Sequence, residues 1–166
     1  MIHLDFLSTI HCLEDERFHQ EIISLIEDGS IKTGKDERTL QAYIWVHLLR
    51  ELKYLRNKDG SFRFKQNWTF NVELYGGNND TPDITIRRIE DPDEILIAIE
   101  IKHYIEMNIG VREKKRIMED IVALNRRKNG IFIISLTNSE SYHDLIEEME
   151  EMKGDNVRII IINQEK

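Results

Sequence analysis

Two short segments, Thr81-Pro82-Asp83-Ile84-Thr85-Ile86 and Ile97-Ala98-Ile99-Glu100-Ile101-Lys102, decide the fold of this chain. Each has the length and isoleucine content of a β-strand. The segment between them contains Asp91-Pro92-Asp93-Glu94, which is rich in turn-forming residues. The sequence therefore predicts that the two segments are neighbouring antiparallel strands of one hairpin.

Three charged residues meet on one face of this predicted hairpin. If the turn is centred between Pro92 and Asp93, Asp83 lies opposite Lys102 and one pleat from Glu100. Side chains alternate between the two faces of a strand, so all three charged side chains share a face. The opposite face is apolar and is formed by Ile84, Ile86, Ile95, Ile97, Ile99 and Ile101.

Charge at the end of a buried strand is costly unless it is paired or bound to an ion. Two neighbouring carboxylates repel each other, and a hard divalent cation such as Mg²⁺ or Mn²⁺ removes that repulsion. The other interpretation is that Glu100 and Lys102 form an ordinary salt bridge at a strand end, with Asp83 as a turn residue.

The pairing of Pro82-Asp83 with Glu100-Ile101-Lys102 resembles the motif of the PD-(D/E)xK nuclease superfamily, which has the restriction-endonuclease-like fold. The resemblance implies that Asp83, Glu100 and the backbone carbonyl of Ile101 bind Mg²⁺ or Mn²⁺. It also implies that Lys102 positions or activates the attacking water. In that family a further glutamate, on the helix before the sheet, often completes the site.

The best candidate for this further glutamate is Glu37, as a catalytic residue and a further metal ligand. Glu37 and Gln41 lie on the apolar stripe of a helix predicted from about residue 36 to residue 56, so both are expected to point toward the sheet. Glu37 could equally serve only the helix dipole in the first turn. Glu73, on a strand predicted over residues 68–75, is another candidate ligand.

The order of predicted elements gives an α/β fold, a three-layer α/β/α sandwich with a mixed central sheet. We expect one nuclease-like domain over residues 1–166, with an N-terminal helical extension at 1–35 and a core at 36–163. The extension contains a helix over residues 4–28. Further helices are predicted over residues 111–127 and 139–152, the last capped by Asn138 or Ser139, and further strands over 131–136 and 157–162.

The composition is that of one globular domain of 166 residues with a net charge of −8, which argues against a protein that coats nucleic acid non-specifically. Cys12 is the single cysteine, so an intrachain disulfide is not possible. The first residues lack the basic segment of a secretory signal, and no apolar run reaches the length of a membrane span. We therefore expect a cytoplasmic protein with no membrane partner.

The resemblance implies a metal-dependent nuclease that hydrolyses phosphodiester bonds. DNA is the more frequent substrate in such families, and RNA is the alternative. Substrate contacts are expected from Gln41, His103, Lys114 and Lys115. Many relatives act as dimers, so a homodimer is one expectation. The alternative function is a catalytically silent module on the same fold that binds nucleic acid or assembles with other proteins.

Overall fold

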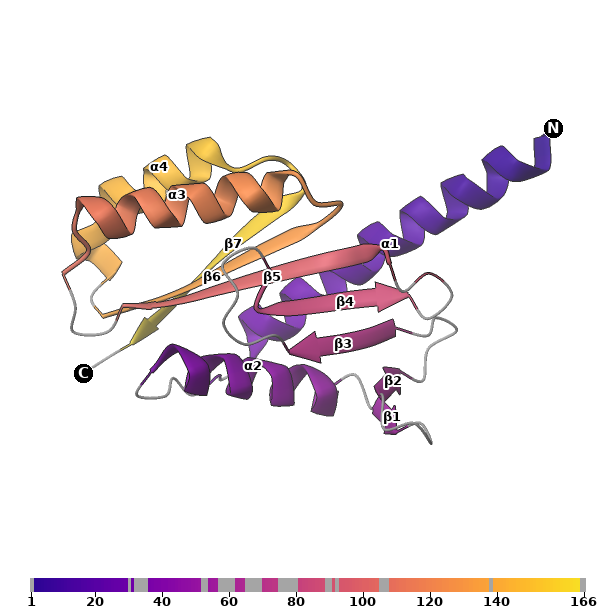
Figure 1. Cartoon of the computed structure of the whole chain (residues 1–166), viewed down its shortest axis with the longest axis horizontal. Helices are drawn as coiled ribbons and strands as arrows, with labels where there is room; N and C mark the ends of the chain where they lie inside the picture. Colours follow the sequence, from indigo (N-terminus) through magenta and orange to yellow (C-terminus); the bar gives the residue numbers. More distant parts are fainter. Residues whose placement is uncertain are drawn as a thin grey trace.

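Figure 1 shows the computed structural model of the chain, an α/β protein in which helices pack on an open, mixed β-sheet. The structure describes residues 2–29, 31, 36–51, 54–56, 62–64, 70–74, 81–88, 91, 93–104, 108–137 and 139–164. None of the helices in this described part is long and apolar enough to cross a membrane.

The central sheet has five strands in the order β3-β4-β5-β6-β7. They are β3 (Phe70–Leu74), β4 (Ile84–Arg88), β5 (Ile95–Tyr104), β6 (Gly130–Thr137) and β7 (Val157–Gln164). The first three strands form an antiparallel meander, and β5, β6 and β7 run parallel. The predicted mixed sheet is therefore confirmed within the described residues.

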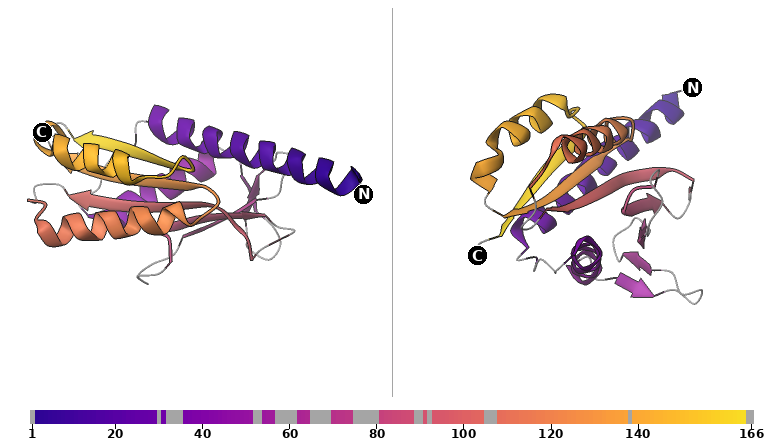
Figure 2. Two further views of the ribbon diagram at one scale, coloured as in Figure 1. Left: turned by 90° about the horizontal axis from the view of Figure 1, so that it is seen from above. Right: turned by 60° about the vertical axis from the view of Figure 1, so that its left-hand side comes forward.

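Four α-helices cover the sheet in the part of the chain that the structure describes, and they lie on both of its faces (Figures 1 and 2). They are α1 (Ile2–Asp28), α2 (Glu37–Glu51), α3 (Val111–Asn125) and α4 (His143–Met152). One core cluster joins α1 and α2 to one face, and a second cluster joins α3 and α4 to the other. Alternate residues of β6 enter the two clusters, which explains its uninterrupted apolar sequence.

The register of the β4–β5 hairpin differs from the predicted one, by two residues at the Asp83 end. Ile84 pairs with Ile99, so continuing the ladder by one residue sets Asp83 opposite Glu100 and not opposite Lys102. Next to the turn, Arg87 pairs with Ile95 and not with the predicted Ala98, an offset of three residues, because the hairpin turns nearer to Asp91 than expected. A β-bulge between Ile86 and Arg87 then reduces the offset to two. On the far side of the bulge the offset is even, so Asp83, Glu100 and Lys102 keep their predicted common face.

The bulge also changes the position of one apolar side chain. Ile97, Ile99 and Ile101 pack in the cluster under α1 and α2, as predicted. Ile95 lies before the bulge and packs instead against the cluster under α3 and α4. The prediction for Ile95 was wrong because an extra residue in one strand reverses the faces on either side of it.

Two other predicted elements have different bounds. The long helix ends at Glu51, because β1 (Tyr54–Arg56) pairs with β2 (Phe62–Phe64) as a small antiparallel hairpin. Leucines at helical spacing made the sequence look helical beyond this point. The predicted C-terminal helix begins as the short 3₁₀-helix η1 (Ser139–Tyr142), and the N-cap of α4 is Tyr142, with no side-chain cap. Ser139 is therefore not the cap of α4, and Asn138 lies outside the described residues.

The C-terminal half of α1 is tied to the sheet by polar contacts, whereas its other end projects beyond the sheet (Figure 1). The side chain of Asp15, only 2% exposed, accepts a hydrogen bond of 2.6 Å from Nζ of Lys128. Glu94 contacts the same ammonium group at 3.3 Å but is 43% exposed. His19, which is buried, bonds through Nε2 to the carbonyl oxygen of Gly130 at 3.1 Å.

We predict that Asp15→Asn lowers the free energy of unfolding by about 1–3 kcal/mol, because it weakens a charged hydrogen bond in a buried position. Glu94→Gln is the matched control and should cost no more than about 0.5 kcal/mol, since its pair with Lys128 is exposed to solvent. Urea denaturation of both variants measures the difference. Equal losses in the two variants would contradict the assignment of Asp15 as the anchor of α1.

Candidate active site

The candidate site forms where β5 emerges from the core. Ala98 is fully buried, and the next two residues on the same face are Glu100 and Lys102, whose side chains are 17% and 19% exposed. This face is the one that α3 covers. Because side chains alternate between the two faces of a strand, Glu100 and Lys102 lie on the same face, at the end where the strand leaves the core.

Asp83 lies immediately before β4 and is connected to β5 by its side chain. Its Oδ2 atom accepts a hydrogen bond of 2.8 Å from the backbone N–H of Ile101. The carboxylate thus takes the place of a strand partner, one residue beyond the last described β4–β5 pair. This bond fixes the Asp83 side chain beside Glu100, as the extended register also predicts.

Lys102 is held between two carboxylates from different elements. Its Nζ atom lies 2.7 Å from Oε1 of Glu100 on the same strand and 3.2 Å from Oδ2 of Asp120 on α3. The Asp120 side chain is 27% exposed, so this ion pair is partly shielded from water. Held from both sides, the ammonium group has a fixed position relative to the sheet.

The site contains more negative charge than Lys102 can neutralise. Burial and, to a smaller extent, the neighbouring charge of Asp83 raise the pKa of Glu100 to about 7 against the opposing effect of Lys102. Burial raises the pKa of Asp83 to about 6, although the Ile101 N–H and Lys102 lower it. Burial lowers the pKa of Lys102, but Glu100 and Asp120 outweigh burial and raise that pKa overall.

Glu37 acts on the site through its charge. It is half-buried in the first turn of α2, and it raises the pKa of both Asp83 and Lys102. The start of the helix is fixed by Asp36, whose Oδ1 accepts hydrogen bonds from the backbone N–H of Thr39 at 2.8 Å and from its hydroxyl at 2.9 Å. Gln41, one turn further, is buried with 8% exposure on the inner face of α2.

Two residues near Lys102 were missed in the sequence. Asp120 sits on the buried stripe of α3, three residues after Ile117 and four before Leu124, both of which are core residues. A carboxylate on an apolar helical stripe is a signal that could have been used. Tyr104 continues the face of Glu100 and Lys102, and its pKa is raised, mainly by burial. The position of Tyr104, two residues after Lys102, could have been used to predict that it shares this face.

The remaining predicted substrate contacts are more scattered. His103 points to the other face of β5, and its charge contributes to lowering the pKa of Asp36, after the larger effect of the Thr39 hydrogen bonds. Lys115 forms an exposed ion pair of 3.7 Å with Glu119, and Lys114 is half-buried. Contacts of His103, Lys114 and Lys115 with a substrate therefore stay predictions. The backbone of Glu73 pairs with Thr85, and its side chain lies outside the described part of the structure.

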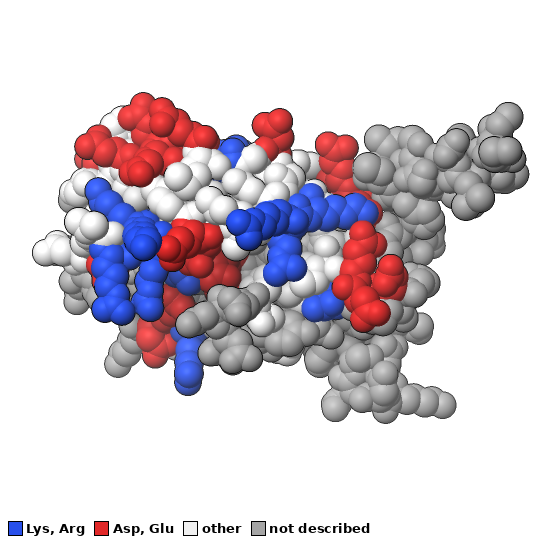
Figure 3. Space-filling model, turned by 45° about the horizontal axis from the view of Figure 1, so that its top comes forward, with Lys and Arg blue, Asp and Glu red and all other residues white. Residues whose placement is uncertain are grey.

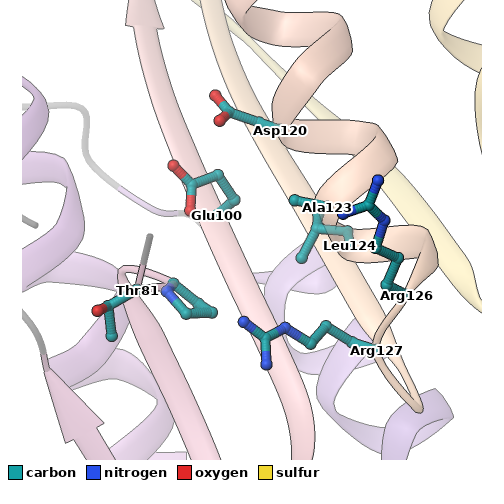
Figure 4. A pocket seen from close by; sticks show the side chains of 8 residues that line it. Thr81, Glu100, Asp120, Ala123, Leu124, Arg126 and Arg127 are labelled. Carbon is teal, nitrogen blue, oxygen red and sulfur yellow. The ribbon is translucent and has the colours of Figure 1, made fainter. Parts of the chain in front are cut away.

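A cleft of about 380 Å³ opens beside Glu100, between the start of β4 and the last two turns of α3. Figure 4 shows Asp120 and Glu100 at one end of this cleft, while Arg127 extends across β5 toward Thr81. The remaining lining residues are Pro82, Ala123, Leu124 and Arg126. The candidate site is therefore accessible from solvent along α3.

The donor set fits a hydrated divalent cation better than a cage of protein ligands. Among the residues that the structure describes, no three His, Cys, Asp or Glu side chains are grouped closely enough to hold a metal ion. Glu37 is therefore not placed as a third ligand beside Asp83 and Glu100. Mg²⁺ is commonly held by one or two carboxylates while it keeps several waters, and the buried, mutually repelling pair meets that requirement.

Comparison of the chain with protein-family models, with curated proteins and with solved structures finds no match. The geometry of the side chains is therefore the basis of any functional conclusion.

We predict that Glu100→Gln stabilises the metal-free protein at alkaline pH. The folded protein holds a proton on Glu100 up to a pKa of about 7, above the ordinary value of 4.5, so stability falls as pH rises between these values. Each pKa unit corresponds to about 1.4 kcal/mol, so charged Glu100 lowers the free energy of unfolding by at most roughly 3 kcal/mol. At high pH we expect Glu100→Gln to raise the free energy of unfolding by about 1–2 kcal/mol. The gain stays below the limit because glutamine can accept a hydrogen bond from Lys102 but cannot form the ion pair.

Thermal melts in EDTA at about pH 8.5 and about pH 4.5 test this expectation, because the gain should shrink at the lower pH. Glu119→Gln, on the exposed side of α3, is the control for removal of one charge. A Glu100→Gln variant that melts below the wild type at both pH values would identify Glu100 as a purely structural ion-pair partner.

Proposed function

We propose that the chain is a metal-dependent phosphodiester hydrolase of the PD-(D/E)xK type that acts on nucleic acid, with DNA as the favoured substrate. One observation carries the proposal: Asp83 and Glu100, two half-buried carboxylates with raised pKa values, lie beside a fixed Lys102 on one sheet face. A surface salt bridge at a strand end does not require this excess of buried acid.

The order of elements is consistent with a restriction-endonuclease-like, three-layer core. An antiparallel hairpin supplies Asp83 and Glu100, and the parallel unit β5–α3–β6 follows it directly. α2 precedes the sheet and brings Glu37 near the site, as the resemblance implies. The whole chain would then be one nuclease-like domain whose N-terminal helix packs on the core.

Asp83 and Glu100, with the Ile101 carbonyl, would hold Mg²⁺ or Mn²⁺. The cation, when bound, supplies positive charge to the phosphate and lowers the pKa of a water molecule. Asp83 is oriented for this role by the Ile101 N–H, and Glu100 by Lys102. Glu37 adds negative charge that favours cation binding without being grouped with the two ligands.

Lys102 acts in this proposal as a fixed cation and hydrogen-bond donor. Its raised pKa keeps it protonated, so it does not serve as the base that deprotonates water. The ammonium group can orient water or stabilise the charge that develops on phosphate oxygens. Asp120 is a positioning residue, because it contacts Nζ of Lys102 from α3 and holds it above the strand.

The reaction would be hydrolysis of one phosphodiester bond. The oxygen of water forms a bond to phosphorus, and the bond to the 3′ oxygen breaks with its electron pair. That oxygen takes up a proton while the attacking water loses one. The products, by analogy with the resembled family, are a 5′-phosphate and a 3′-hydroxyl.

We predict that the purified protein cleaves labelled DNA or RNA in Mg²⁺ or Mn²⁺ and that Lys102→Met reduces kcat by at least about 100-fold, since it removes a preorganised charge. Asp83→Asn and Glu100→Gln should abolish the metal-dependent activity. Lys153→Met is the control, because Lys153 also pairs with a glutamate but lies at the end of α4. Metal-independent binding without cleavage by the wild type would select the silent binding module instead.

We predict a smaller, diagnostic effect for Asp120→Asn. Loss of one of the two carboxylates around Lys102 should lower kcat about 10-fold and leave KM within about twofold, because ground-state binding does not depend on this contact. Glu119→Gln, on the same helix, should leave both constants unchanged. A large rise in KM with unchanged kcat would show that Asp120 contacts the substrate and does not act through Lys102.

A further inference from the structure

Arg127 is the cation best placed to act in the cleft beside Glu100. It is half-buried two residues after the end of α3, and Figure 4 shows its side chain extending across β5 toward Thr81. Within the described residues, no ion pair or hydrogen bond engages its guanidinium group or that of Arg126. By contrast, Lys102 is held by two carboxylates in the same region.

The two ends of the cleft have opposite charge. Glu100 and Asp120 make one end acidic, whereas Arg127 makes the other end basic, and the exposed Arg126 adds positive charge along the α3 side of the cleft (Figure 4). The exposed acidic side chains of α4 add negative charge elsewhere on this side of the sheet. Figure 3 shows a group of acidic side chains at the upper edge of the molecule, and basic side chains interspersed with further acidic ones below it. A polyanion is therefore attracted to the arginine end.

We propose that Arg127, assisted by Arg126 at the rim and by the Thr81 hydroxyl, binds the phosphate of the substrate strand next to the one that is cleaved. This inference rests on the proposed hydrolase function. A guanidinium group binds phosphate in a bidentate manner, and a hydroxyl group is a common second donor to nucleic-acid backbones. The cleft volume of about 380 Å³ is within the range of small-ligand sites.

A consequence concerns the substrate class. A strand must carry at least two consecutive phosphates to reach the acidic end and the arginine end together. Backbone contacts of this kind carry no base information, so binding is expected to be independent of sequence. A nucleic-acid strand is therefore favoured over a mononucleotide or another small phosphodiester.

Arginines at a helix C-terminus also have an ordinary structural role, since they interact favourably with the helix dipole. Here the turn is closed by backbone bonds from Arg126 N–H to Ala123 at 3.3 Å and from Arg127 N–H to Leu124 at 2.9 Å. Asn156 adds a bond of 2.7 Å to the Arg127 carbonyl. The side chains can therefore be replaced without loss of these backbone contacts.

The experiment is fluorescence anisotropy of a short labelled single-stranded DNA in EDTA, where no cleavage interferes. Arg127→Gln should weaken binding about 10-fold and Arg126→Gln about 2–3-fold. Each lost phosphate contact should also reduce the slope of log K against log salt concentration by about 0.7. Arg127→Lys keeps the charge at the helix end but loses the paired hydrogen bonds of the guanidinium group, so it should still weaken binding by about threefold. Arg17→Gln, an exposed arginine on α1 across the sheet, is the control for net charge.

Binding by Arg127→Gln that equals binding by Arg17→Gln would overturn the inference, as would a wild type that binds no DNA in EDTA. Full recovery of binding in Arg127→Lys, with a lowered melting temperature in Arg127→Gln, would also overturn it in favour of the helix-end role. Cleavage in Mg²⁺ is scored separately. Absence of cleavage by the wild type would reject the hydrolase proposal, whereas a binding defect confined to the Arg127 variants would support the phosphate site.

Discussion

The structure of the site depends on one constraint, the partial removal of two carboxylates from water: Glu100 lies near the end of β5, which is buried along most of its length, and Asp83 lies beside it, just before β4. β5 has helices on both faces, so its alternation directs Ile97, Ile99 and Ile101 into one core and Ala98, Glu100 and Lys102 toward α3. The Ile101 N–H stabilises the carboxylate of Asp83, and Lys102 stabilises that of Glu100. Glu100 also reaches solvent through the cleft. Their raised pKa values show that these contacts do not compensate fully for burial. A cation would complete the compensation, which is the physical reason for the proposed chemistry.

Much of this arrangement could be predicted because it depends on a period of two. Glu100 and Lys102 share a face whatever the register, and Asp83 joins them for any even shift of the hairpin. The observed register differs by three residues next to the turn and by two beyond the bulge, and neither the position of the turn nor the bulge left a clear signal in the sequence. Asp120 was missed because its partner Lys102 is 18 positions away in the chain, and only tertiary packing brings α3 over β5. The end of α2 was misjudged because leucine spacing is compatible with a helix, whereas residues 54–56 are recruited by pairing with residues 62–64.

The charges on this side of the sheet have distinct tasks in the proposed account. Lys102 is fixed by Glu100 and Asp120 and serves the reacting group, whereas Arg127 stays available for the strand that leads to it. The net charge of −8 is then no obstacle, since much acidic charge lies on the exposed side of α4. Specific placement of a few cations replaces the broad basic surface of proteins that coat nucleic acid.

The central claim is that the buried pair of carboxylates binds a divalent cation, and calorimetric titration of Mn²⁺ at about pH 6.5 tests it most directly. Because the pKa values of Asp83 and Glu100 are about 6 and about 7, cation binding should expel protons, and the measured heat should vary with the ionisation enthalpy of the buffer. The account predicts binding with proton release in the wild type and loss of both in Glu100→Gln. Absence of binding, or equal binding with the same proton release in Glu100→Gln, would contradict it.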